Sequence, residues 1–339
     1  MKIWKILSPK VLTTEERPDN ITSATQAKVK ITRVLLSDGD FRAFGGTSKP
    51  HYPVIPGRFA VGVVTETGAE CLNVEKNTRV FLHDVIPCRN CPDCLSGKPE
   101  NCISPRTAGV SSEGYLREFA VAEESDLSPL PPAVSDKDAL LIGVISLCES
   151  VIDRLDAPKG THIAVFGADV VGNVLAQLLI YHKAVPILVD SDESKLERAS
   201  QCGIYYTLKA DESLKENLLR ITGGRLAAAS VFCSFSGLSA ELAFKATAER
   251  GIVVCAGFEF PEMTAQLKTA LDKRLTVTAV TEEAAGSAAA INLLVNKAVY
   301  PQPLGIAEVP ATEIGRLFSE QAETAEKSGR AHYGIVNML

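Results

Sequence analysis

The sequence lacks an excess of positive charge. Lysine and arginine together number 35, against 41 aspartate and glutamate residues, so the formal net charge is −6. Proteins that bind nucleic acid usually present a basic patch or a basic net charge. Runs of one charge, low-complexity tracts and internal repeats are also missing. We therefore expect a folded protein that acts without a nucleic-acid partner.

Long apolar runs are absent as well. A membrane-spanning helix needs about 20 consecutive apolar residues, and no stretch of the chain has them. The opening residues, MKIWKILSPK, carry neither the long apolar core nor the small-residue cleavage site of a signal peptide. These absences predict a cytoplasmic protein without a membrane partner.

The cysteines do not form the pattern of a disulfide framework. Their number, nine, is odd. Five of them are scattered singly through apolar or mixed segments, at Cys71, Cys148, Cys202, Cys233 and Cys255. This distribution is typical of reduced thiols in a cytosolic chain.

The other four cysteines lie close together in the stretch IPCRNCPDCLSGKPENC (residues 86–102). Cys88, Cys91, Cys94 and Cys102 have the spacing C-x2-C-x2-C-x7-C, which favours a closed tetrahedral zinc site. The alternative, ordinary free cysteines on a loop, would expose thiols at a high density. Four sulfur ligands leave zinc no open position for water or substrate. We therefore predict one structural zinc per chain and look for the chemistry elsewhere.

The hydrophobic pattern changes along the chain. A length of 339 residues usually corresponds to about two domains. Up to about residue 145, short β-like runs are separated by Gly and Pro, and from about residue 150 strands alternate with helices. The alternation predicts an α/β fold with a parallel, doubly wound sheet. The expected strands are 162–167, 185–190, 229–236, 251–258 and 275–280, and the expected helices are 173–183, 193–203 and 239–251.

The segment FGADVVG (166–172) lies where the first of these strands turns into a helix. It matches the dinucleotide fingerprint G-x-G-x-x-G at the first and last glycine, and an aspartate closes the next strand. That carboxylate is expected to accept the ribose hydroxyls of NAD and to repel the 2′-phosphate of NADP. The alternative is that the glycines only permit a tight turn and close helix packing. The candidate nucleotide-binding residues are Gly167, Asp169, Val170, Val171, Gly172 and Asp190.

Asp169 stands where the fingerprint has its middle glycine, which normally lets the backbone approach the pyrophosphate. A carboxylate facing the phosphates from about 5 Å would cost about 3 kcal/mol at an effective dielectric near 20. In the other arrangement, the side chain turns away and caps the N-terminus of the helix. The sequence leaves both arrangements open.

These features together resemble the zinc-containing alcohol dehydrogenase family of the medium-chain dehydrogenase/reductase superfamily. The resemblance covers nearly the whole chain and is carried by PCRNCPDCLSGKPENC, LPPAVSDKDALL, ITGGRLAAASVFCSFSG and ERGIVVCAGF. It implies a GroES-like β-barrel catalytic domain (1–145) with the zinc lobe, a Rossmann nucleotide-binding domain (146–286), and a C-terminal return to the catalytic domain (287–339). It also implies hydride transfer between NAD(P) and an alcohol or carbonyl. The apolar edge strand RLTVTAVTEE (274–283) implies a homodimer or a tetramer of dimers.

Members of this family usually carry a second, catalytic zinc, and the resemblance places its ligands on residues that do not bind metal. The first ligand falls on Ser37, the second on Arg58 and the third within 142–144. A guanidinium has no lone pair to give at any accessible pH. Asp40 matches an aspartate of the first motif, and Arg42 falls where many members carry a proton-relay histidine. We therefore expect no catalytic zinc. The unconventional ligands that remain are His51, His83, Cys148 and Glu149.

Two roles are open for Arg58. It could pair with Asp40 and fill the empty zinc cavity. Alternatively, its guanidinium replaces the metal as a fixed positive charge that polarises a carbonyl or holds a substrate carboxylate, with Arg42 as a second donor. Ser37 would be a proton donor or a small filler. The candidate catalytic residues are therefore Ser37, Asp40 and Arg58.

Three functions follow from these alternatives. The first is a metal-independent oxidoreductase that uses NAD(H) on a small carbonyl, alcohol or activated double bond. Because Arg58 and Arg42 are positively charged, its substrate could be an anion. The second is a catalytically silent relative that serves as a binding or scaffold protein. The third is an ordinary zinc enzyme with displaced ligands. Asp190 favours the first function, and Asp169 favours the second.

Overall fold

The structure is a computed structural model that describes residues 1–18, 20–48, 50–233, 238, 240–258, 267–281, 287–328 and 332–339. It divides the chain into two compact units: unit 1 comprises Met1–Gly143, Glu283–Val295 and Ile306–Leu339, and unit 2 comprises Val144–Glu282 and Asn296–Gly305. The C-terminal segment is thus shared between the units. Parts of the expected strand 229–236, helix 239–251 and edge strand 274–283 lie outside the described residues.

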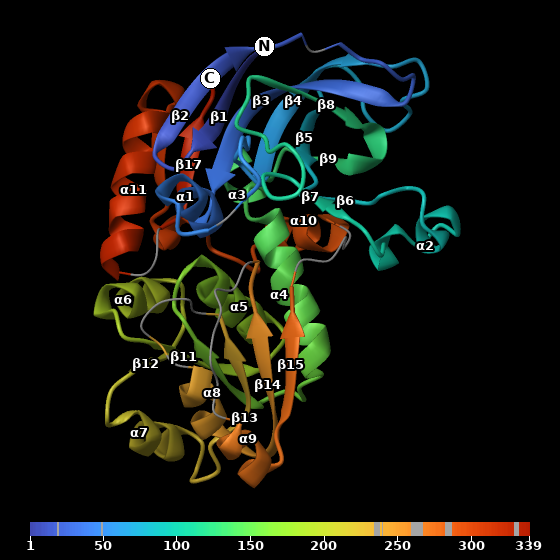
Figure 1. The fold of residues 1–339 in the computed structure, drawn as a ribbon. Coiled ribbons are helices and arrows are strands. Elements are labelled where there is room, and N and C mark those ends of the chain that lie inside the picture. Colours follow the sequence, from blue (N-terminus) through green and yellow to red (C-terminus); the bar gives the residue numbers. More distant parts are fainter. Residues whose placement is uncertain are drawn as a thin grey trace. The chain divides into compact units, whose positions relative to one another are not determined.

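Unit 2 contains a six-stranded parallel sheet, as the alternation of strands and helices predicted (Figure 1). In spatial order its strands are β12 (Tyr206–Lys209), β11 (Val185–Asp190), β10 (His162–Phe166), β13 (Ala227–Phe232), β14 (Thr247–Ala256) and β15 (Thr276–Val280). Strands β10, β11 and β13 are almost wholly buried, because helices cover both faces of such a sheet. The chain order reverses between β10 and β13. Ligands of open α/β sheets bind at such a point, beside the carboxyl ends of the strands.

The helices of unit 2 pack their apolar faces on this sheet. In α5 (Val170–Tyr181), every residue from Val170 to Leu179 is buried. Phe166, Phe232 and Phe244 lie at the centre of the core between sheet and helices. The other helices are α4 (Ile142–Leu155), α6 (Glu193–Gln201), α7 (Leu214–Ile221), α8 (Ala240–Ala246) and α9 (Lys268–Lys273), with a 3-10 turn at Gln302–Leu304.

The helix predicted over 239–251 is wrong in its second half. Helix α8 ends at Ala246, and β14 begins at Thr247. The Thr247 hydroxyl donates to the Ala243 carbonyl oxygen at 2.7 Å. Lys273 Nζ donates to three backbone carbonyl oxygens at this end of the helix, at distances from 2.7 to 3.2 Å. The helix ends here because its last carbonyl groups are satisfied from α9, a contact that sequence periodicity does not reveal.

Unit 1 is built mainly from antiparallel strands. Its seven-stranded sheet has the order β16 (Ala307–Pro310), β17 (Gly334–Asn337), β3 (Gln26–Leu36), β4 (Phe59–Thr67), β5 (Arg79–Leu82) and β9 (Leu127–Pro129), and β8 (Phe119–Glu123) pairs with β3. The β16–β17 pair is parallel, and the other pairs are antiparallel. Two small ladders join β1 (Lys2–Ser8) to β2 (Val11–Glu16) and β6 (Val85–Ile86) to β7 (Arg106–Thr107).

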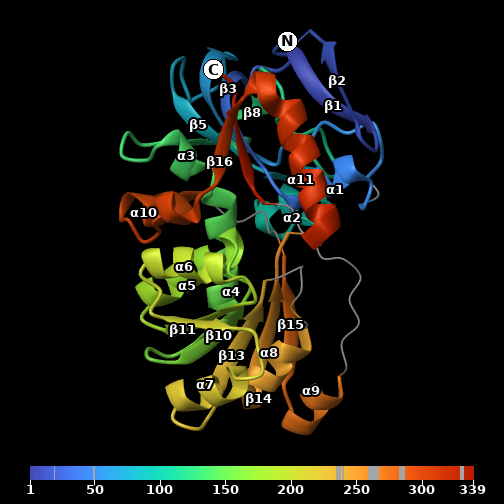
Figure 2. The same ribbon diagram turned by 90° about the vertical axis from the view of Figure 1, so that its left-hand side faces the viewer.

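The core of unit 1 is closed by two helices that lie side by side, α1 (Asp38–Gly45) and α11 (Ile314–Ser328) (Figure 2). The rings of Phe41 and Phe44 on α1 each lie 5.3 Å, centroid to centroid, from the ring of Phe318 on α11. The shorter helices of the unit are α2 (Pro92–Leu95), α3 (Asp136–Ala139) and α10 (Ser287–Val295), with 3-10 turns at Pro99–Asn101, Glu124–Asp126 and Ala311–Glu313. Within the described ranges, no helix combines the length and the apolar character needed to cross a membrane.

Candidate functional site

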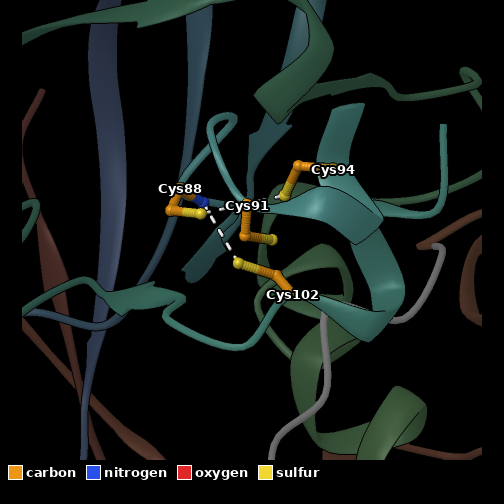
Figure 3. A group of neighbouring side chains, drawn as sticks. All are labelled: Cys88, Cys91, Cys94 and Cys102. Carbon is orange, nitrogen blue, oxygen red and sulfur yellow. Dashed lines mark hydrogen bonds between the residues drawn. The ribbon is translucent and has the colours of Figure 1, made fainter. Parts of the chain in front are cut away.

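The four clustered cysteines of unit 1 converge on one point (Figure 3). Cys88 and Cys91 precede α2, Cys94 lies within it, and Cys102 follows the 3-10 turn at Pro99–Asn101. The four sulfur atoms lie within 4.8 Å of one another, and Cys88 Sγ is 4.0 Å from Cys94 Sγ. The local spacing therefore produces the cluster that the sequence predicted.

This arrangement has the size of a tetrahedral zinc site. Zn–S bonds of about 2.3 Å would hold four sulfurs about 3.8 Å apart. The Cys88 N–H donates to Cys102 Sγ at 3.2 Å, and backbone hydrogen bonds from Cys94 and Ile103 lower the pKa of the Cys91 thiol to about 6. Among the residues that the structure describes, these four cysteines are the one group of His, Cys, Asp or Glu side chains able to hold a metal ion.

The position expected for the first ligand of a second metal is occupied by a helix cap. Ser37 is the N-cap of α1, and its N–H and hydroxyl donate to Asp40 Oδ2 at 2.8 and 3.1 Å. Asp40 Oδ1 accepts the Gly57 N–H at 2.8 Å. Burial raises the pKa of the Asp40 carboxyl, and the three hydrogen bonds together with the Arg58 charge oppose the rise. Asp40 thus links the start of α1 to the loop that precedes β4.

Arg58 forms its ion pair with Asp84. Its Nε donates to Asp84 Oδ2 at 2.9 Å, and its guanidinium carbon lies 5.4 Å from the centroid of the Phe59 ring. Only 3% of Arg58 is exposed. The predicted pairing of Arg58 with Asp40 is present as a charge interaction that opposes the rise in the pKa of the Asp40 carboxyl, while the Asp40 oxygens accept hydrogen bonds from Ser37 and from the Gly57 N–H.

Arg42 likewise has a partner on its own helix. Its Nε donates to Asp38 Oδ2 at 2.6 Å, across one turn of α1. Both side chains are partly exposed, at 19% each. Such a pair is local and solvated, in contrast to the buried Arg58–Asp84 pair.

The third ligand position offers no donor atom. Ile142 and Val144 are aliphatic and fully buried. Between them, a Cβ atom added to Gly143 would lie 2.2 Å from Cε1 of Phe59, so this position accepts no side chain. Together with a bonded hydroxyl at Ser37 and a guanidinium at Arg58, these residues do not fit a catalytic zinc.

The unconventional ligands do not assemble a metal site either. His83 Nε2 lies 2.8 Å from Ser128 Oγ, and burial lowers the pKa of its imidazole. In unit 2, Cys148 Sγ is 3.6 Å from the Val171 carbonyl oxygen. Among the residues that the structure describes, His51, His83, Cys148 and Glu149 do not belong to any group of side chains close enough to hold a metal ion.

The candidate nucleotide turn of unit 2 lies at the reversal point of the parallel sheet. Gly167 follows β10 with φ +105°, a conformation that favours glycine. A Cβ added to Gly172 would lie 1.8 Å from the Gly167 carbonyl oxygen, so α5 can start this close to the turn only with glycine there. Val170 and Val171 form the first turn of α5. The free N–H groups of such a first turn form an anion-binding end.

Asp190 holds this turn from the end of β11. Its Oδ2 accepts the Ala168 N–H at 2.7 Å, and its Oδ1 accepts the Asp192 N–H at 3.0 Å. Only 3% of Asp190 is exposed. Each carboxylate oxygen has two lone pairs, so each retains one after these bonds. The carboxylate thus ties the end of β11 to the Gly167–Gly172 turn.

Asp169 does not form the predicted helix cap. It is the N-cap of α5, but its side chain makes no capping hydrogen bond among the described residues. Its Oδ2 instead lies 3.3 Å from Lys195 Nζ, on α6. The predicted helix cap is therefore wrong, and a cation compensates the carboxylate.

Lys195 is the residue of this candidate site that the sequence did not predict. It is 7% exposed and shares the inner face of α6 with Leu196 and Ala199. A lysine on the buried face of an amphipathic helix, five residues after Asp190, was the available signal.

Comparison with known families agrees with this architecture. The family described as "Alcohol dehydrogenase GroES-like domain" matches residues 23–132, and the family described as "Zinc-binding dehydrogenase" matches residues 170–294. The predicted fold class, a GroES-like domain plus a Rossmann domain, is confirmed.

Individual relatives cover the chain to different extents. The starvation-sensing protein RspB of Escherichia coli (strain K12) is 26% identical over 216 residues, which are 63% of this chain and 64% of that protein. A sorbitol dehydrogenase of Halalkalibacterium halodurans is 24% identical over 323 residues, 94% of this chain and 93% of that protein. A solved alcohol dehydrogenase (rspB) from E. coli CFT073, complexed with cofactor NADH, has a TM-score of 0.84 at 21% identity and covers 100% of this chain and 99% of that one. The chain is therefore similar, in both of its matched regions, to zinc-type alcohol dehydrogenases.

Proposed function

We propose that this protein is an NAD(H)-dependent oxidoreductase that acts on a small carbonyl, alcohol or activated double bond without a catalytic zinc. The observation that carries the proposal is the nucleotide turn. Asp190 accepts the Ala168 N–H, and Lys195 compensates Asp169, the residue that argued against cofactor binding. A compensated carboxylate repels a pyrophosphate much less than the bare carboxylate does.

The chain's own residues would divide the binding of the dinucleotide between them. The Gly167–Gly172 turn and the first N–H groups of α5 would receive the pyrophosphate. Asp190 would accept the ribose hydroxyls, which favours NAD(H) over a 2′-phosphorylated cofactor. When bound, NAD(H) supplies or accepts the hydride.

In unit 1, we propose that the Arg58–Asp84 pair takes the place of the metal. Arg58 is a fixed positive charge in a buried environment, where electrostatic interactions are strong. Asp84 compensates much of that charge, which favours substrates that need little Lewis-acid activation, such as conjugated double bonds or imines. Ser37 and Asp40 would position the loop beside Arg58, with the Ser37 hydroxyl as a candidate proton donor.

The four-cysteine lobe is proposed to hold one structural zinc ion per chain. A closed set of four thiolates has no open position for a substrate, so the ion would stabilise the lobe and take no part in hydride transfer.

The test of the nucleotide site is NADH binding to the Asp190→Ala variant, followed by NADH fluorescence. Loss of the carboxylate removes the ribose acceptor and leaves the buried Ala168 N–H without its partner. We expect affinity to fall by about tenfold to hundredfold. The matched control is Asp192→Ala, which removes an exposed N-cap of α6, costs about 1 kcal/mol of stability and leaves affinity unchanged.

Asp190→Asn keeps the size of the side chain and one acceptor oxygen, so it separates lost binding from lost folding. The oxidoreductase proposal fails if the wild-type chain binds neither NADH nor NADPH at about millimolar concentration. A Kd of about 1 mM corresponds to a binding free energy of only about −4 kcal/mol. The alternative function, a catalytically silent relative that serves as a binding or scaffold protein, would then replace it.

The protein is further proposed to form a homodimer, or a tetramer of dimers, through β15. This strand ends the sheet of unit 2, and its Val277 is 44% exposed. An unpaired edge invites pairing with a second copy.

Light scattering at micromolar concentration is expected to give at least twice the chain mass of 36.2 kDa. Val277→Lys should shift the mass toward the monomer, whereas Leu271→Lys, at an exposed leucine of α9, should not. A monomeric wild type would contradict the proposal.

A further inference from the structure

Unit 2 contains a pocket that the nucleotide site does not use. Its volume is about 460 Å³, within the range of small-molecule sites. Leu214 and Leu218 of α7, Leu242 of α8 and Leu226, which precedes β13, form its apolar lining. Leu214 and Leu218 are buried, and Leu226 and Leu242 are partly exposed. The pocket therefore offers an apolar ligand a preformed surface.

The pocket lies at the amino-terminal ends of the strands of the parallel sheet. Leu226, Ala246 and Lys273 line it, and each lies just before a strand, β13, β14 or β15. Figures 1 and 2 show α7 and α9 at the end of this unit away from the arrowheads of β14 and β15. The Gly167–Gly172 turn follows the carboxyl end of β10. In a parallel sheet, the amino-terminal ends of all strands lie on one side and their carboxyl ends on the opposite side. The pocket and the nucleotide turn are therefore separate sites.

Three lysines border the apolar lining, one from each helix. Lys215 belongs to α7, Lys245 to α8 and Lys273 to the end of α9. Lys273 is fixed by its bonds to the carbonyl groups at the end of α8, and Lys245 Nζ lies 2.9 Å from Glu241. Lys215 is exposed. Burial, together with the nearby Lys215 charge, lowers the pKa of Lys273, as expected where two ammonium groups repel each other.

Two acidic residues, Asp211 and Glu212, also border the pocket. Asp211 accepts the N–H and the hydroxyl of Ser213, at 2.9 and 2.6 Å, and so serves the start of α7. The pocket lining carries three ammonium groups and two carboxylates, and one of the ammonium groups, Lys245, is paired with Glu241. The mutual repulsion of Lys215 and Lys273 is relieved by an anion and increased by a cation.

We propose that this pocket binds an amphipathic carboxylate, with its hydrocarbon chain on the leucines and its carboxylate beside Lys215. The hydrocarbon is removed from water by the four leucines. The Lys215 side chain is long and flexible enough to follow the head group. The ligand class is that of saturated, medium-chain fatty acids, and the site is a second one, independent of nucleotide binding.

The test is calorimetric titration of the full-length chain with decanoate. We expect one molecule per chain with a Kd of about 100 µM, and binding of the uncharged analogue decanamide at least about threefold weaker. Lys215→Gln should weaken decanoate binding about threefold, and Lys215→Glu about tenfold, because the charge is first removed and then reversed. Leu242→Trp, which fills the pocket, should abolish saturable binding.

Arg220→Gln is the matched control. Arg220 is an exposed cation on the same helix as Lys215 but is not part of the pocket lining, so its loss should change affinity less than about twofold. Circular dichroism checks that Leu242→Trp is folded, and the Lys215 variants alter only an exposed side chain. The proposal is overturned if decanoate shows no saturable binding up to about 2 mM, a concentration that would detect a binding free energy as weak as about −4 kcal/mol. It is equally overturned if decanamide binds as well as decanoate, or if both Lys215 and Leu242 variants behave as the wild type does.

Discussion

Purified protein is expected to carry one zinc ion per chain, and Cys91→Ser is expected to lose it. The variant removes one of four sulfurs that lie within 4.8 Å of one another and leaves a three-sulfur site. Structural zinc contributes on the order of 10 kcal/mol to the folding of small zinc-binding peptides. We therefore expect elemental analysis to fall from about one zinc to nearly none per chain, with proteolysis appearing within residues 86–102.

The matched control for this prediction is Cys71→Ser. Cys71 is also a partly buried cysteine of unit 1, but its Sγ bonds to the carbonyl oxygen of Gln26 at 3.3 Å and lies outside the cluster. This variant should retain the metal. Two tightly bound zinc ions per wild-type chain would contradict the proposed loss of the catalytic site, and full zinc retention in Cys91→Ser would contradict the assignment of the cluster.

Features that depend on local spacing were predictable from the sequence. The four cysteines come together because short turns within residues 88–102 bring their sulfurs to one point. The turn at Gly167 and Gly172 is likewise set by neighbouring residues, since Gly167 has φ +105° and a Cβ on Gly172 would clash with the Gly167 carbonyl oxygen. Asp190 follows from the parallel pairing of β10 and β11, which places the end of β11 beside the turn.

Features that depend on a partner far along the chain were not predictable in this way. The partner of Arg58 is chosen by the packing of β4 against the segment after β5, which brings Asp84 to the guanidinium. The end of α8 is set by Lys273, from α9. The choice of Lys195 as the partner of Asp169 depends on how α6 packs beside the nucleotide turn. In each case the sequence contains the charged residue but does not specify its contact.

The pairing of Asp169 with Lys195 weakens the argument that Asp169 prevents cofactor binding. A bare carboxylate in place of the middle glycine argued for a protein that had lost its cofactor. An ion pair at that position carries no net charge, so the turn remains compatible with a pyrophosphate. Asp169 is therefore not a bare charge at the turn, because Lys195 compensates it.

The Arg58–Asp84 pair is a different kind of replacement, because it introduces two charges into a buried place. The exposed fractions of the two side chains are 4% and 13%. Desolvation makes such a pair a weak source of net stability, but removal of one partner leaves the other charge buried and uncompensated. The cost of a single substitution should therefore exceed the cost of replacing both residues.

Arg58→Met is accordingly expected to destabilise unit 1 by about 3–5 kcal/mol and to lower its Tm by roughly 10 °C. Trp4, the single tryptophan of the chain, lies in the core of unit 1, so its fluorescence reports unfolding of this unit.

Arg42→Met is the matched control: it makes the same change at the partly exposed pair with Asp38 and should cost no more than about 1 kcal/mol. The double variant Arg58→Met, Asp84→Leu should recover part of the loss, because Asp84 is no longer left without its partner. Equal effects of Arg58→Met and Arg42→Met, or a double variant no more stable than Arg58→Met alone, would show that the buried pair does not hold this part of unit 1 together.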